Sequence, residues 1–71
     1  MKTQLRYILH SRGAEIFEQQ YTTMEEALIA KESLVKERSI NVFNGQYSER
    51  KNIDAQASLW IEAREVEVNH D

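Results

Sequence analysis

The chain has 71 residues with no cysteine and no proline, and its 12 acidic and 9 basic side chains give a net charge of −3. This length allows one domain, residues 1–71. A domain of this size buries only about 60% of the surface that its unfolded chain exposes. Disulfides and typical zinc sites need cysteine, so a tight core or a second subunit must stabilise the fold. The mild, interspersed acidity argues against general nucleic-acid binding and against a basic membrane-binding surface.

The first third of the chain predicts a β-hairpin. Residues 3–10 alternate between apolar and polar side chains with the two-residue period of a strand. Gly13 follows in a segment short enough for a hairpin loop. Residues 14–21 then predict the returning strand, with Phe17 on one face and Ile16 on the other.

A helix is predicted over residues 23–38. Thr23 and Glu26 have the spacing of a capping box, in which Thr23 accepts a hydrogen bond from the Glu26 amide and the Glu26 side chain reaches back. Ile29 is expected to be a single exposed apolar residue on the charged side. One side of the helix carries Met24, Ala27, Leu28, Lys31, Leu34, Val35 and Arg38.

The segment after the helix has two open interpretations. Residues 40–43 resemble a strand, and Asn44 with Gly45 is the strongest turn signal in the chain. In the first interpretation, residues 46–48 pair back on that strand as a tight hairpin. In the second, residues 46–56 form a polar connecting loop before the last element.

The last element is predicted as a strand over residues 59–68, because its ends are rich in strand-forming residues and a small sheet needs more strands. A helix over residues 53–68 is the alternative. The apolar residues at the start and at the end of the strand point to opposite faces. A bulge at 63–65, or burial of both faces, would explain this pattern.

Together these elements predict an α+β fold, a small antiparallel ββαββ sheet with one helix packed on one face. The predicted core follows from the apolar faces of the strands and of the helix. It consists of Leu5, Tyr7, Leu9, Phe17, Met24, Ala27, Leu28, Leu34, Val35, Ile40, Val42, Leu59 and Ile61.

The other face of this sheet would carry more apolar side chains than a monomer usually exposes. Three explanations remain open: a strand whose alternation is assigned to the wrong face, a symmetric homodimer, or a surface that binds another protein or stacks nucleobases. Glutamates beside the aromatic residues make nucleobase stacking unfavourable. The predicted interface residues are Ile8, Ile16, Phe43, Trp60, Val66 and Val68.

Residues that could carry chemistry are few. His10 next to Ser11 lacks a third orienting group, and His70 with Asp71 and Glu67 is a poor metal site because it lies at the chain end. The two glycines lie too far apart for a phosphate-binding loop. We therefore expect no enzyme activity, no cofactor and no metal.

Arg50 and Lys51 form the only basic cluster, which is expected to be a solvated loop. The alternative is a contact point for an acidic partner or a phosphate, for which the cluster is too small to be specific. No segment is apolar enough for a signal peptide or a membrane helix, so we expect a cytoplasmic location. The sequence thus predicts a small non-enzymatic protein-binding or regulatory protein that forms a homodimer and has a protein partner. An RNA- or DNA-associated binding module is the alternative. Phages and mobile elements use small chains of this composition to bind host components. This comparison is based on size and composition, and no particular residue supports it.

Overall fold

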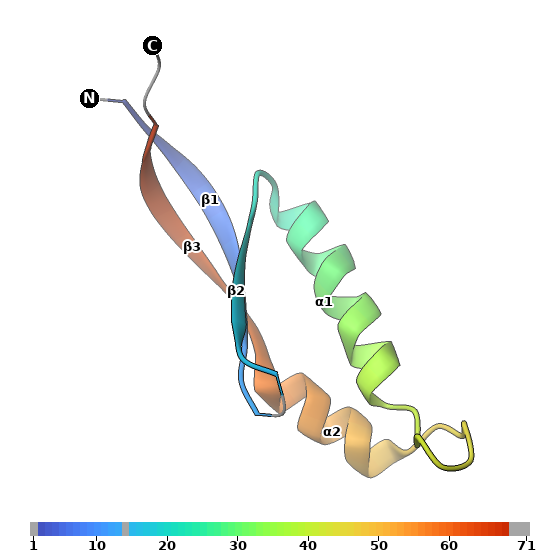
Figure 1. Ribbon diagram of the computed structural model, residues 1–71. Helices are drawn as coiled ribbons and strands as arrows, with labels where there is room; N and C mark the ends of the chain where they lie inside the picture. Colours follow the sequence, from blue (N-terminus) through green and yellow to red (C-terminus); the bar gives the residue numbers. More distant parts are fainter. Residues whose placement is uncertain (1, 14, 69–71) are drawn as a thin grey trace.

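The computed structural model describes residues 2–13 and 15–68. Figure 1 shows an elongated molecule in which a sheet is accompanied by two helices. The elements in chain order are β1 (Lys2–Ser11), β2 (Phe17–Tyr21), α1 (Met24–Arg38), α2 (Glu49–Ser58) and β3 (Leu59–Val68). The predicted α+β class is confirmed.

The sheet is antiparallel, with β1 in the centre and the strand order β2-β1-β3. β2 pairs only with the second half of β1, from Tyr7 to Ser11. β3 pairs along all of β1 in one continuous register, from Lys2 opposite Val68 to Ser11 opposite Leu59. The predicted last strand is therefore confirmed. Of the two explanations for its apolar pattern, the bulge at 63–65 is absent, because the register is continuous there. The apolar residues at the two ends of β3 do lie on opposite faces, because side chains alternate along a strand.

α1 begins where the sequence predicts it. The Thr23 hydroxyl accepts a hydrogen bond from the Glu26 backbone amide at 3.1 Å. The Glu26 carboxylate accepts from the Thr22 hydroxyl at 3.3 Å, in place of the expected backbone contact. α1 contacts all three strands, whereas α2 contacts α1 and β3.

The predicted strand at 40–43 is wrong. Ile40 and Tyr47 form an isolated antiparallel bridge, and the backbone turns at Gly45 with a φ of +67°. The short pairing around Asn44 and Gly45 therefore exists, but it ends at once in α2, which the ββαββ prediction lacks. Ser48 begins α2, because its hydroxyl accepts from the Lys51 amide at 3.3 Å. The described chain thus has the order ββααβ, with three strands and two helices.

The core is small. The buried apolar residues in the described ranges are Ile8, Leu9, Ala27, Ala55 and Leu59. Of the predicted core, Leu9, Ala27 and Leu59 are buried, and Tyr7, Phe17, Leu34, Val35 and Ile61 are half-buried. The exposed members are Leu5, Met24, Leu28, Ile40 and Val42. The prediction buried these residues in a four-stranded sheet that the helix covers along more of its length. The observed sheet has three strands, and these residues are exposed.

A polar contact helps to fix α1 on the sheet. The Arg38 guanidinium at the end of α1 donates to the Ser11 hydroxyl at 2.7 Å and to the Ser58 hydroxyl at 3.0 Å. Ser11 is itself buried. The face of the sheet that carries Ser11, Leu9 and Leu59 is therefore the helix-side face, and the face that carries Ile8 and Trp60 is the open face.

The molecule is far from spherical. Its radius of gyration is 14.9 Å and its extents are 51 × 20 × 18 Å, whereas a compact chain of this length has a radius of gyration of about 11 Å. Figure 1 shows the reason: β1 and β3 project as a two-stranded ribbon beyond β2 and α1. In the described ranges, no helix is long and apolar enough to cross a membrane.

Candidate functional site

The open face of the sheet is mainly polar, not apolar. Ile8 lies at its centre in β1 between Gln20 of β2 and Glu62 of β3. Only 1% of Ile8 is exposed, because the side chains around it cover it. The predicted interface loses its central residue, since Ile8 is already buried within one chain.

A charged and aromatic cluster covers this part of the open face. The His10 ring stacks on the Trp60 ring with 5.0 Å between centroids, and the Arg12 guanidinium lies 5.6 Å from the Trp60 ring centre. His10 Nε2 donates to a Glu62 carboxylate oxygen at 2.7 Å, and His10 Nδ1 lies 3.4 Å from Glu18. Each imidazole nitrogen of His10 therefore faces a carboxylate.

Glu62 connects this cluster to Arg64. The Arg64 guanidinium donates to both Glu62 carboxylate oxygens, at 2.7 and 3.1 Å. Hydrogen bonds from Arg64, and then from His10, lower the pKa of the Glu62 carboxyl below its ordinary value. The cluster keeps the carboxylate charged, which suits an ion pair and not a general acid. Within residues 2–13 and 15–68, no group of three acidic or histidine side chains is placed to hold a metal ion; His70 and Asp71 lie outside the described residues.

The remaining predicted interface residues do not form one patch. Ile16 is 82% exposed in the loop before β2, and Trp60 is exposed on the open face. Val66 and Val68 are half-buried in the projecting ribbon. Phe43 lies in the connection between α1 and α2. Figure 1 shows this connection at the opposite end of the molecule from the tip of the ribbon.

The two most exposed large apolar residues of the described chain lie in that connection. Val42 is 86% exposed and Phe43 is 98% exposed, and Ile40 and Tyr47 are also exposed. We call these four residues the apolar loop. The prediction that Ile40 and Val42 belong to the core is wrong, because the apolar run before Asn44 is an exposed turn and not a buried strand.

Hydrogen bonds hold the apolar loop in one shape. The Gly45 amide donates to the Asn41 carbonyl at 2.7 Å, and the Asn41 amide donates to the Gln46 carbonyl at 2.8 Å. The Asn41 side chain accepts from the Phe43 amide at 3.0 Å, and the Asn44 side chain accepts from the Gln46 amide at 2.9 Å. The exposed side chains are therefore carried by a fixed backbone.

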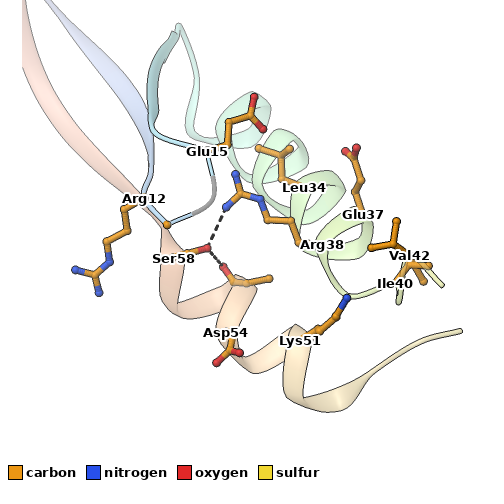
Figure 2. Close-up of a pocket in the computed structure, with 12 residues that line it drawn as sticks. Arg12, Glu15, Leu34, Glu37, Arg38, Ile40, Val42, Lys51, Asp54 and Ser58 are labelled. Carbon is orange, nitrogen blue, oxygen red and sulfur yellow. Dashed lines mark hydrogen bonds between the residues drawn. The ribbon is translucent and has the colours of Figure 1, made fainter. Parts of the chain in front are cut away.

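An open cleft of about 540 Å³ lies next to the apolar loop, between the β1–β2 hairpin, the end of α1 and α2. Ile40, Val42 and Lys51 line the same part of it (Figure 2). Arg38 crosses the inner part to reach Ser58, and Arg12 points away from the cleft (Figure 2). The cleft is lined by both acidic and basic side chains, so its charge selects neither an anion nor a cation.

The structure brings the predicted basic pair close to the apolar loop. Arg50 and Lys51 lie in the first turn of α2, and Arg50 is exposed while Lys51 is half-buried. Sequence reasoning missed this proximity because it did not predict α2. The Ser48 cap was the available signal, since serine directly before a charged stretch is a common helix start.

No protein-family model, curated protein or solved structure matches the chain.

Proposed function

We propose that the chain is a non-enzymatic protein-binding module and that the apolar loop is its contact surface. The observation that carries this proposal is the near-complete exposure of two adjacent apolar side chains, Val42 and Phe43. Contact between these side chains and water is unfavourable in the free protein. Their burial by a partner therefore contributes favourable free energy to binding.

The fixed backbone of the apolar loop supports the same proposal. Binding costs entropy when a loop must first become ordered, and a loop held by its own hydrogen bonds avoids much of that cost. The Asn41 and Asn44 side chains hold the backbone on either side of Phe43. Phe43 therefore suits the role of an anchor that enters an apolar pocket of the partner.

Charges near the apolar loop indicate the chemistry of the partner. Arg50 and Lys51 follow the loop at the start of α2, where the helix dipole adds positive potential. The partner surface that fits has an apolar pocket for Phe43 and a carboxylate opposite the basic pair. A cytosolic partner agrees with the cysteine-free composition.

The alternative, nucleobase stacking on sheet aromatics, has less support. Trp60 is stacked against His10 and has Arg12 beside it, while Glu18 and Glu62 add negative charge around the pair. Phosphate groups would be repelled by those carboxylates.

The test compares two exposed apolar sites on the same protein. The double variant Val42→Asp with Phe43→Asp should lose roughly 30-fold in affinity for a captured partner, as expected for a hot-spot residue. Ile29→Asp is the matched control, because Ile29 is 64% exposed on α1, away from the apolar loop. The measurement is quantitative pull-down from native lysate, followed by titration of the purified partner. Equal capture by the double variant and by the control would overturn the proposal.

A further inference from the structure

The outer edge of β3 is the longest unpaired strand edge in the described chain. β3 spans 10 residues, and β1 is its only neighbour in the sheet. Its outward backbone amides and carbonyls make no hydrogen bond within the described ranges. An edge of this kind is a template for pairing with another strand.

Symmetry restricts how two copies can meet at this edge. An antiparallel pair of identical edges needs a twofold axis perpendicular to the sheet, so that both open faces lie on the same side. The residue on the axis then lies opposite the same residue of the second copy. A residue that comes a given number of positions before it lies opposite the residue that comes the same number of positions after it in the second copy. Each register is therefore defined by one axial residue.

Charge selects among the registers with long overlap. An axis at Glu62, Arg64 or Glu65 places that charged residue directly opposite itself, which is destabilising. An axis at Val66 overlaps only residues 64–68 and places Glu65 opposite Glu67. An axis at Ile61 creates no like-charged pair but overlaps only residues 59–63. An axis at Ala63 creates no like-charged pair and overlaps residues 59–67 of both copies.

The open face becomes complementary in this register. Glu62 lies opposite Arg64 of the second copy on both sides of the axis, and Trp60 lies opposite Val66. Within one chain, Arg64 lies opposite Arg6, a like-charged pair, and Arg64 forms an ion pair with Glu62 on the same strand. A second carboxylate from the other copy would stabilise Arg64 further.

We propose that two copies of this chain pair through β3 in antiparallel register with Ala63 on the twofold axis. The dimer contains one continuous sheet of six strands, β2-β1-β3 followed by the same strands of the second copy in reverse. The pairing gives the projecting ribbon a neighbour along its open side. It does not depend on the apolar loop, so either proposal can fail without the other.

Two other strand edges are less suitable than β3 for pairing with a second copy. The outer edge of β2 has only five residues, Phe17–Tyr21. The part of β1 beyond β2 would place Lys2 opposite Arg6 in a pairing centred on Gln4. β3 offers the longer edge and the better match of charges.

Single cysteines in this cysteine-free chain test the register. Ala63→Cys places two thiols directly opposite each other, about 5 Å apart at Cα, which is within reach of a disulfide. Glu65→Cys is the matched control on the same face, because its two copies would be about 13 Å apart. Gln19→Cys reports pairing through β2.

Under mild oxidation, Ala63→Cys should form a covalent dimer about tenfold faster than Glu65→Cys and Gln19→Cys, because only its thiols are within bonding distance. Equal rates for all three variants, or the fastest rate at Gln19, would overturn the proposal. Each variant is first shown to be folded by circular dichroism.

Sedimentation of the cysteine-free protein tests the charge complementarity. Arg64→Glu should raise the dimer dissociation constant about tenfold, and the exchange Glu62→Arg with Arg64→Glu should restore it. A single 8.4 kDa species up to millimolar concentration would refute the dimer. Unchanged dimerisation in Arg64→Glu would refute the register.

Discussion

Ile8 shows how a single residue can be buried on the open face of a sheet. It lies in the central strand, with Gln20 on one side and Glu62 on the other, and the aliphatic parts of such long polar side chains can cover an apolar neighbour. Leu9, the next residue, is buried on the helix-side face. Two adjacent residues of β1 thus stabilise the fold from opposite faces.

Ile8→Ala should lower the free energy of unfolding by about 3 kcal/mol, because it removes buried methyl groups and leaves a cavity. This loss is a large share of the stability expected for a domain of this size. Ile16→Ala is the matched control: Ile16 is exposed, so its loss should stay within about 0.5 kcal/mol. Urea unfolding followed by fluorescence of Trp60 measures both. A small effect at Ile8 would mean that its burial contributes little.

Glu62 should make the protein sensitive to acid. Its pKa is lowered by the hydrogen bonds from Arg64 and His10, so the folded state binds the proton less readily than the unfolded state. The stabilisation is therefore complete above the ordinary pKa of 4.5 and is lost as pH falls through the lower folded value. Glu62→Gln should flatten the decrease in unfolding free energy between neutral pH and acid.

The control for this pH profile is Glu65→Gln, which removes a carboxylate on the other face of β3 and leaves the contacts of Glu62 with Arg64 and His10 in place. Urea midpoints at a series of pH values give the comparison. Identical slopes for Glu62→Gln and the wild type would show that the contacts of Glu62 do not depend on its charge.

At the scale of elements, local signals determined what the sequence could predict. The Thr23 cap and the alternation of β1 depend on residues close together in the chain, and both were predicted correctly. The β1–β2 hairpin was also predicted, but β2 begins at Phe17 and not at residue 14. α2 was missed because its sequence contains few apolar residues, and only Ala55 is buried. A short polar helix gives little periodicity, so its place between α1 and β3 depends on tertiary contacts.

The candidate site was harder to predict for the same reason. Val42 and Phe43 were assigned to separate places, one in the core and one in the interface, because strand alternation places neighbours on opposite faces. In the structure both are exposed, since the backbone turns at this point and does not follow a strand. An apolar run directly before Asn-Gly cannot by itself distinguish a strand from an exposed turn.

Ser48→Ala tests how α2 is held in place. The Ser48 hydroxyl accepts from the Lys51 amide, and losing this cap should cost about 1 kcal/mol of stability. Ser33→Ala, at an exposed position inside α1, should be neutral or slightly stabilising, because alanine favours helices. Amide exchange should accelerate most in the first turn of α2. An equal effect of both variants would contradict the capping role.

At the scale of the whole molecule, the chain is divided into a covered part and a projecting part. The covered part contains the buried residues and both helices. The projecting ribbon, residues 2–6 with 64–68, has two strands and no helix over it (Figure 1). Arg6 faces Arg64 within it, and Leu5 is half-exposed. Two strands without a covered face are only marginally stable in water.

The ribbon should therefore open locally while the rest of the chain stays folded. In dilute solution, amides of residues 2–6 that bond to β3 should exchange at least about tenfold faster than those of Ile8 and Leu9, because ribbon opening needs no global unfolding. Hydrogen exchange followed by nuclear magnetic resonance measures this ratio. Pairing through β3 would add a strand beside the ribbon, so the ratio should shrink as protein concentration rises. Uniform protection along β1 in dilute solution would show that two strands are enough to hold the ribbon closed.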